Sequence, residues 1–232
     1  MGTELAVRPA TAADLPVLAE IHLASRRAAG TAFPAAVHSD DVTRAWVAGW
    51  DLTAYDVWLA THGPQVAGYA RWTPTWLDDL YVHPDHQGSG AGTALFETVT
   101  AHLPGGFCLW VFESNAPARA FYARRGCLEL ERTDGSANEE RSPDLRVAWP
   151  GPEPVVFLRE LIDDVDLVLG DVLARRTALT RAVQSVKPSG ERDPAREAEI
   201  ARRVAAVVPE LGQDRVARIV DVIISESLDA SR

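Results

Sequence analysis

The sequence predicts two domains, an α/β or α+β domain over residues 1–149 and an all-helical domain over residues 157–232. Up to Trp149, short β-like runs alternate with helical runs, as is typical of domains that combine a sheet with helices. The segment WPGPEP (149–154) then places three prolines and a glycine together, and such a segment cannot continue a helix or a central strand. Residues 150–156 are therefore predicted to be a linker. After them, apolar residues recur at helical spacing.

Within the first domain, short apolar or alternating runs predict strands and longer runs with a helical period predict helices. The polar segment Thr133–Asp144 is expected to be a hairpin loop. The predicted strands are Glu4–Arg8, Val57–Thr61, Gln65–Trp72, Trp76–Val82, Phe107–Phe112, Cys127–Arg132 and Leu145–Trp149. The predicted helices are Thr11–Ala28, Ala91–His102 and Ala116–Arg125.

The second domain is expected to contain three helices. Apolar residues from Leu158 to Val183 recur at the period of a long first helix. A second helix is predicted from about Pro194 to Val208, because Asp193 is suited to the N-cap and proline to the first turn. A third helix is predicted from about Gln213 to Leu228.

Composition excludes several classes of function. The formal net charge is −10, and acidic residues outnumber basic ones in both halves, so neither nucleic acid nor an anionic membrane is an expected partner. No apolar run reaches the length of a membrane span, and the N-terminus lacks the pattern of a secretory signal. Cys108 and Cys127 lie in apolar segments and are expected to be reduced core residues, with no metal site. We therefore expect a cytoplasmic protein.

A glycine-rich turn follows the predicted strand Trp76–Val82 and precedes a predicted helix. Gly88, Gly90 and Gly92 fall within five residues, in HPDHQGSGAGTALFETV. Glycines there let the backbone approach a ligand closely, and the free N–H groups of the helix start attract a phosphate. This feature alone is weak evidence, because a loop without a ligand can have the same composition.

Three further features accompany the turn: the pattern Q-x-x-G-x-G beginning at Gln87, the preceding LYVHP (80–84), and LWVFESN followed by ARAFYARRG (109–126). In order and spacing this set resembles the GNAT acetyltransferases over roughly residues 3–149. A dinucleotide-binding fingerprint fits less well, because it belongs near the first strand and needs an acidic residue about 20 positions later. The resemblance implies a mixed, mostly antiparallel sheet with flanking helices and acetyl-CoA as co-substrate.

The resemblance also implies roles for individual residues. The backbone of Leu80 and Val82 would pair with the pantetheine arm of CoA, and Asn115 would contact CoA near the second helix. Tyr122 would protonate the departing thiolate, although packing alone would also explain it. The pyrophosphate would lie against Gln87, Gly88, Ser89, Gly90, Ala91 and Gly92.

The base that takes the proton of the incoming amine is expected on the strand before the turn. Asp78 is the first candidate and Asp79 the second; because neighbours on a strand point to opposite faces, at most one of them faces the cleft. A solvated or capping role is an equal alternative for either. The acceptor amine is not identifiable, because the segments near Ala32–Asp51 and Thr73–Trp76 carry no diagnostic cluster beyond tryptophans.

The second domain carries cations beside its apolar seam. Arg159 and Arg176 are 17 residues apart, and Lys187, the only lysine of the chain, follows 11 residues later. At 3.6 residues per turn, Arg176 and Lys187 share a helix face and Arg159 is offset by less than a third of a turn. Cations beside apolar residues are costly unless an anion meets them. The next helix begins with DPARE (193–197).

This arrangement resembles the all-helical (AroQ-type) chorismate mutases over roughly residues 157–231. The resemblance implies a three-helix protomer of the shikimate pathway and aromatic amino acid biosynthesis that forms a homodimer through its long first helices. Each site would take Arg159 from the partner chain. Its own chain would supply Arg176, Lys187, Asp193, Arg196, Glu197 and Ser227.

The chemistry of chorismate rearrangement explains these residue types. The reaction needs neither a nucleophile nor a cofactor, but the enzyme must hold two carboxylates and stabilise negative charge on the ether oxygen. Guanidinium groups suit the carboxylates. The ammonium of Lys187 suits the ether oxygen, and Glu197 can accept a hydrogen bond from the ring hydroxyl. Each of these residues taken singly also fits an ordinary surface position.

One position departs from the family pattern. Where the family usually has Gln or Glu, this chain has Ser231, whose side chain is too short to reach the ether oxygen. Losing one such donor costs on the order of 10²–10³ in rate. The helical domain is thus a slow mutase, is completed by an activating partner enzyme, or acts on 4-amino-4-deoxychorismate. There are two alternatives to a bifunctional enzyme. In the first, the acetyltransferase is active and the helical domain is a chorismate-sensing or dimerisation module. In the second, both domains are binding modules. The fusion also raises the hypothesis that an amine made downstream of chorismate is the acetyl acceptor.

Overall fold

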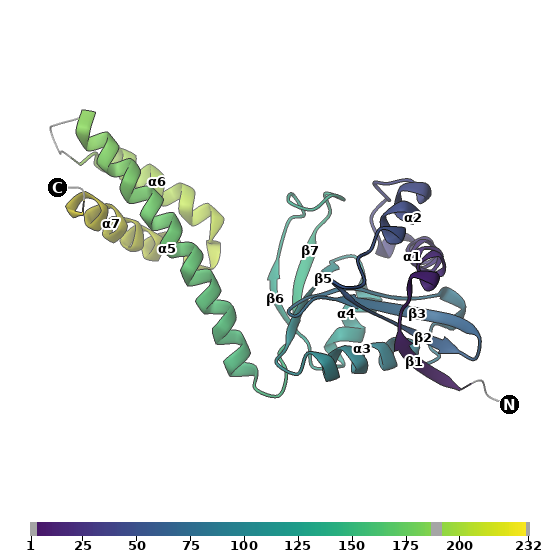
Figure 1. Ribbon diagram of the computed structural model, residues 1–232. Helices are drawn as coiled ribbons and strands as arrows, with labels where there is room; N and C mark the ends of the chain where they lie inside the picture. Colours follow the sequence, from purple (N-terminus) through teal and green to yellow (C-terminus); the bar gives the residue numbers. More distant parts are fainter. Residues whose placement is uncertain (1–3, 187–191, 231–232) are drawn as a thin grey trace. The chain divides into compact units, whose positions relative to one another are not determined.

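The computed structural model describes residues 4–186 and 192–230 (Figure 1). The chain divides into two compact units, Met1–Leu158 and Arg159–Arg232, each of which is described here by itself. Lys187 and Ser231, two residues predicted to lie in the mutase site, are outside the described residues.

The first unit is built on two antiparallel sheets. The larger sheet has the strand order β1-β2-β3-β4, and the smaller has the order β5-β7-β6. The strands of the larger sheet are β1 (Leu5–Pro9), β2 (Asp56–His62), β3 (Gln65–Trp72) and β4 (Leu77–Val82). Those of the smaller sheet are β5 (Phe107–Phe112), β6 (Leu128–Arg132) and β7 (Asp144–Trp149). Every predicted strand is confirmed close to its predicted bounds.

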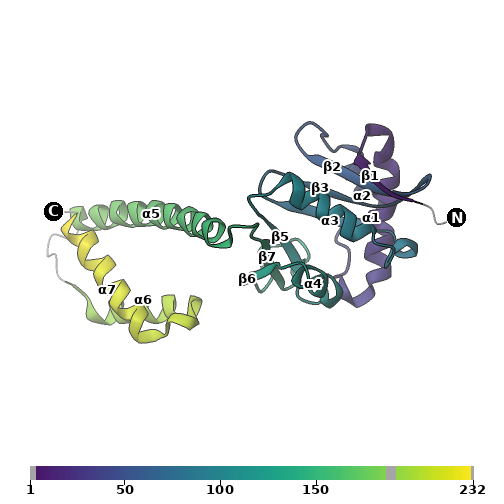
Figure 2. The same ribbon diagram turned by 90° about the horizontal axis from the view of Figure 1, so that it is seen from below.

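Helices cover both faces of the larger sheet (Figures 1 and 2). Helices α1 (Leu15–Ala29) and α2 (Asp40–Ala48) pack with β2 and β3 in one buried cluster, and α3 (Ala91–His102) packs in a second cluster that α4 (Ala116–Ala123) joins through Tyr122. The strand residues divide accordingly: Val57 and Leu59 belong to the first cluster, whereas Ala60 belongs to the second. This is the alternation that a two-sided buried strand requires.

The predicted helices of this unit are confirmed, but α2 was not predicted. Its sequence, DDVTRAWVA, is only nine residues long, which is shorter than the window over which a helical period is recognised. The helix is favoured instead by its start, where Ser39 caps the N–H of Val42 and two aspartates occupy the first turn.

The second unit consists of helices. The long helix α5 (Pro154–Val186) begins within the range predicted as linker, because a proline in the first helical turn loses no hydrogen bond. Helices α6 (Pro194–Val207) and α7 (Gln213–Asp229) follow. The side chain of Asp193 accepts a hydrogen bond from the N–H of Arg196 at 3.0 Å, which confirms it as the N-cap of α6.

The buried core of the second unit is small. It joins α6 and α7 through Ala201, Val216, Val220 and Ile224. Of the side chains of α5, only Phe157 is buried, and that residue belongs to the first unit. Large apolar side chains elsewhere on α5 stay exposed, by 49% at Leu169 and by 75% at Leu167. Within the described residues, no helix combines the length and apolar character that a bilayer crossing needs.

Candidate functional site

The two sheets of the first unit separate at a point that creates a cleft. Among the described residues, β4 and β5 are linked by one isolated parallel bridge, between Trp76 and Cys108. Beyond this bridge the strands belong to different sheets, so the edge of β4 that faces β5 lacks a strand partner in the described chain. That edge, at Leu80 and Val82, leaves backbone groups free to pair with an extended ligand.

The glycine-rich turn lies at the end of β4. Gly88 and Gly90 have φ values of +75° and +94°, which residues with a side chain adopt only under strain, and Gly90 is the N-cap of α3. Gly92 packs closely, since an added Cβ would lie in van der Waals contact with a methyl of Val82 at 3.4 Å and the ring of Phe121 at 3.6 Å. The turn thus presents the unused N–H groups of the first turn of α3, as an anion site requires.

A cavity of about 1110 Å³ occupies the cleft. It is lined by most of the residues predicted to bind CoA, whereas Ser89 and Ala91 do not contribute to its wall. Those on the wall are Leu80, Val82, Gln87, Gly88, Gly90, Gly92 and Asn115.

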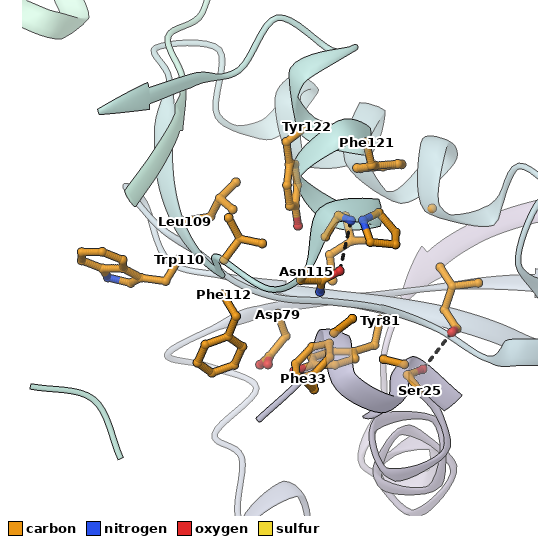
Figure 3. Close-up of a pocket in the computed structure, with 18 of the residues that line it drawn as sticks. Ser25, Phe33, Asp79, Tyr81, Leu109, Trp110, Phe112, Asn115, Phe121 and Tyr122 are labelled. Atoms are coloured by element: carbon orange, nitrogen blue, oxygen red, sulfur yellow. Dashed lines mark hydrogen bonds between the residues drawn. The ribbon is translucent and has the colours of Figure 1, made fainter. Parts of the chain in front are cut away.

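Two of these wall residues, Val82 and Asn115, already accept hydrogen bonds within the chain, which are the dashed lines in Figure 3. Ser25 of α1 donates a hydrogen bond of 2.8 Å to the carbonyl of Val82, which leaves that oxygen one further lone pair. The side-chain oxygen of Asn115 caps α4 by accepting from the N–H of Ala118 at 3.1 Å, so its amide group is what remains for a ligand.

Tyr122 projects from α4 toward the cleft (Figure 3), and its side chain is buried. Burial raises the pKa of its phenol well above the ordinary value, with the neighbouring Cys127 as the second cause. The phenol therefore keeps its proton at neutral pH and can donate it.

A second cavity, of about 850 Å³, lies beside the first between α1, α2 and β4. The two cavities share wall residues, among them Phe33, Asp79 and Tyr81. Figure 3 shows these three side chains on the side of the cleft opposite Tyr122. A group held at Asp79 thus lies where the two cavities meet.

Both candidate bases line the larger cavity, so the prediction that at most one of them faces the cleft is wrong, but the two side chains are placed differently. Asp78 is exposed and lines the larger cavity, whereas Asp79 is buried and lines both. Asp79 is opposite Arg71 in the register of β3 and β4, and its Oδ2 lies 2.6 Å from the Nε of Arg71. Burial raises the pKa of the Asp79 carboxyl, and the Arg71 charge opposes that rise. The geometry thus favours Asp79 over Asp78 as the base.

His22 of α1 lies on the wall of the smaller cavity. It is buried, and its Nδ1 lies 2.9 Å from the hydroxyl of Tyr69. Burial lowers the pKa of its imidazole to about 4, and the charges of Arg26 and Arg71 add to the effect. The imidazole is therefore neutral at physiological pH.

This shift predicts a pH dependence of stability. Between its ordinary pKa of 6.5 and about 4, His22 binds a proton in the unfolded chain but not in the folded one. Stability is thus unaffected by His22 above pH 6.5 and falls as the pH drops toward 4, by about 2 kcal/mol at pH 5. We expect His22→Gln to lose about that much less stability than the wild type between pH 7 and pH 5.

Urea unfolding followed by tryptophan fluorescence measures this, since all seven tryptophans lie in the first unit. His102→Gln, at an exposed histidine, is the control and should follow the wild-type curve. Parallel pH curves for His22→Gln and the wild type would contradict the assignment.

In the second unit, α5 and α7 meet through an arginine and a serine of the predicted set. Arg176 donates from Nη1 to the hydroxyl of Ser227 at 2.6 Å and to the carbonyl of Ile223 at 3.2 Å. Ser227 is buried and Arg176 is partly buried. The guanidinium is thereby fixed by one nitrogen, which leaves the others to bind a carboxylate.

Glu197 lies in a cluster that the sequence did not predict. Arg192 binds both of its carboxylate oxygens, at 2.8 and 2.7 Å. The same guanidinium contacts Asp221 at 2.5 Å and the hydroxyl of Ser225 at 3.1 Å, both on α7. Arg192 thus connects the first turn of α6 with α7.

The remaining predicted residues are dispersed. Arg159 and Arg196 are exposed. Because Arg159 and Arg176 are 17 residues apart on one helix, they are separated by about 25 Å along it. Arg159 therefore does not reach the Arg176 site of its own chain.

Several residues that line these cavities escaped the sequence reasoning. Only Arg71 could have been predicted from the sequence. It is a cation in the otherwise apolar run QVAGYARW, and the next strand contains two aspartates, a pattern that indicates an ion pair between the strands. The others are placed by tertiary packing alone: Ser25, Arg26, Phe33, Tyr81 and Arg124.

Comparison with protein-family models finds two matches. The model of the acetyltransferase (GNAT) family matches residues 20–127, and that of chorismate mutase type II matches residues 158–232. No curated protein matches the chain.

Solved structures resemble the first unit. YjaB from Escherichia coli, in its apo form, is 22% identical with a TM-score of 0.54, over 64% of this chain and 99% of that one. yncA from Salmonella typhimurium, solved with its cofactor acetyl-CoA, is 20% identical with a TM-score of 0.51, over 63% and 94%. A GCN5-related N-acetyltransferase from Kribbella flavida is 17% identical with a TM-score of 0.50, over 63% and 97%. At these identities the likeness establishes the fold.

Proposed function

Because the chain joins a GNAT acetyltransferase domain to a chorismate mutase type II domain, we propose that it is a bifunctional enzyme. One domain transfers the acetyl group of acetyl-CoA to an amine, and the other rearranges chorismate to prephenate. The observation that carries the proposal is that each matched domain holds converging polar groups suited to its reaction. These are the cleft beside α3 in the first and the Arg176–Ser227 contact in the second.

Acetyl-CoA suits the larger cavity as a substrate. The positive φ values of Gly88 and Gly90 and the N–H groups at the start of α3 fit the pyrophosphate. The edge of β4 fits the amides of the pantetheine arm, which would bind like an added strand. Bound in this way, acetyl-CoA supplies a thioester that the amine attacks.

The residues at the junction of the two cavities serve the proton transfers. Asp79 takes the proton of the attacking amine, since it is the buried carboxylate on both walls; Glu140 also lines both cavities but is less buried and is paired with Arg26. Tyr122 donates a proton to the departing thiolate, since its phenol stays protonated. The carbon–nitrogen bond forms as the carbon–sulfur bond breaks, and N-acetylated amine and CoA leave.

Calorimetric titration of the full chain with acetyl-CoA tests this half. We expect saturable binding at one site per chain. Absence of binding would overturn the acetyltransferase and leave the first unit as a scaffold.

For the mutase reaction, the second unit of one chain supplies guanidinium and carboxylate groups, but these groups do not form a complete site. Arg176 is anchored by Ser227 and suits a carboxylate of chorismate, and Glu197 suits the ring hydroxyl. Lys187, for which we propose the contact to the ether oxygen, lies outside the described residues. A second carboxylate contact is still needed.

A second copy of the chain completes the site. The apolar side chains left exposed along α5 give a surface that a single chain does not bury. If the α5 helices of two chains pair in opposite directions, the Arg159 of each approaches the Arg176 of the other. We therefore propose a homodimer in which each mutase site takes Arg159 from its partner.

Mixing two inactive variants tests this arrangement. Arg159→Ala and Arg176→Ala homodimers should each lose mutase activity. After subunits are exchanged at equal concentrations, half of the dimers are mixed and each has one intact site, so about a quarter of wild-type activity should return. No recovery, despite exchange verified by differently tagged chains, would contradict the shared site.

The wild-type chain also separates the alternatives that Ser231 raises. Consumption of chorismate supports the mutase, and consumption of 4-amino-4-deoxychorismate alone would change the substrate. Binding of chorismate without turnover would make the helical domain a sensor.

A further inference from the structure

The smaller cavity of the acetyltransferase domain contains a buried ion pair that its own chain satisfies only in part. Arg71 and Asp79 are each largely buried, with side-chain exposures of 11% and 7%. They touch through one bond, from Nε to Oδ2. Among the described residues, none accepts from Nη1 or Nη2 of Arg71 and none donates to Oδ1 of Asp79.

The free nitrogens of Arg71 and the free oxygen of Asp79 are not among the buried polar atoms that lack a partner, so they are accessible from the cavity. Buried charged groups normally have their hydrogen-bonding capacity filled, because each unmade bond costs desolvation free energy. Other ion pairs on the same wall, such as Arg26–Glu140 and His38–Glu139, are more exposed. The open positions of Arg71 and Asp79 thus point to a polar ligand.

The surroundings of Arg71 define the rest of this site. Its guanidinium carbon lies 5.3 Å from the ring centroid of Trp46, 4.8 Å from that of Trp50 and 4.7 Å from that of Tyr55. These rings hold the guanidinium plane in place. The cavity wall beside Trp46 is apolar, with Phe33 and Val42 among its residues.

We propose that this cavity takes an α-amino acid with an apolar or aromatic side chain as the acetyl acceptor. The carboxylate binds the free nitrogens of Arg71, and the amine lies at Asp79. A cation and an anion side by side match the two adjacent charges of an α-amino acid. The side chain of the acceptor packs against Trp46 and Phe33.

This inference rests on the proposed acetyltransferase and completes its reaction. The ammonium of the acceptor first releases one proton to solvent through Asp79. The neutral amine nitrogen then attacks the thioester carbonyl, and Asp79 receives its second proton as the carbon–nitrogen bond forms. Tyr122 protonates the CoA thiolate, so an N-acetylamino acid and CoA are the products. Arg71 binds the acceptor and takes no part in the bond changes.

The experiment compares L-phenylalanine with L-phenylalaninol, which keeps the amine and ring but replaces the carboxylate. With the full chain and acetyl-CoA, we expect kcat/KM to be about 100-fold higher for L-phenylalanine. Arg71→Gln should remove most of that preference, because activity on L-phenylalanine should fall much further than activity on L-phenylalaninol. Arg44→Gln is the matched control, since Arg44 is an exposed arginine of α2 paired with Glu20 and Asp41, and it should keep the preference.

If Arg71→Gln folds poorly, the ratio of kcat/KM for L-phenylalanine to that for L-phenylalaninol in the wild-type chain decides the proposal by itself. Equal use of the two acceptors, or use of neither while another class of amine is acetylated, would overturn it and leave the acetyltransferase intact. If acetyl-CoA does not bind, the acetyltransferase fails instead. Quenching of the tryptophans by L-phenylalanine, but not by L-phenylalaninol, would still support the amino acid site.

Discussion

Replacing Arg176 with alanine is expected to lower kcat/KM for chorismate rearrangement by about 10³-fold. Arg176 is held by Ser227 and by the carbonyl of Ile223, so its guanidinium is oriented before the substrate arrives. A fixed guanidinium binds a carboxylate of the transition state with little loss of side-chain entropy. The loss of chorismate absorbance measures the effect.

The adjacent Arg175 is the matched control. It is exposed and pairs with Asp171 one turn away, so Arg175→Ala should change the rate by less than about threefold. Acetyl transfer should be unaffected in both variants, because they lie outside the first unit. Equal activity of the Arg175 and Arg176 variants would show that the chemistry lies elsewhere.

The sequence predicted the strands well because their signals are local. Alternating apolar residues and intervening turns set each strand of the first unit. Helix α2 was not predicted, because its nine residues give too few repeats to distinguish a helical period. Its existence depends on a cap at Ser39 and on packing against α1, and packing is not readable from a window of sequence.

The two cavities of the first unit also differ in how far the sequence predicts them. The glycine-rich turn is continuous in sequence, so its place at the start of α3 was predictable. The smaller cavity joins α1, α2, β3 and β4, and Arg71 meets Asp79 only through the register of two strands. The sequence analysis placed Asp78 before Asp79 as the candidate base, because the alternation of side chains along a strand does not say which face of the strand is buried.

In the helical domain, the sequence indicated that Arg176 and Ser227 belong together, and the structure places them in contact. It gave no indication of Arg192, which precedes the N-cap of α6 and so belongs to no periodic pattern. The carboxylate of Glu197 is bound by Arg192 in the single chain. Substrate binding at Glu197 therefore requires Arg192 to share or release that carboxylate.

Replacing Asp79 with asparagine is expected to lower kcat for acetyl transfer by about 10³-fold. Asparagine has nearly the same shape, and its carbonyl can still accept from the Nε of Arg71, but it cannot take a proton. Because burial raises the pKa of the Asp79 carboxyl, the wild-type rate should fall on the acid side at a pH above the ordinary aspartate value of 3.8. That acid limb should be absent from the residual activity of Asp79→Asn.

Asp78→Asn is the matched control, one residue away on the same strand with an exposed side chain. It should keep both the rate and the acid limb within about threefold, because an exposed carboxylate contributes little to a buried reaction centre. The opposite ranking, with Asp78→Asn inactive and Asp79→Asn nearly normal, would reassign the base to Asp78. In that case the amine would approach through the larger cavity, which Asp78 lines, and the Arg71–Asp79 pair would bind the acceptor without taking its proton.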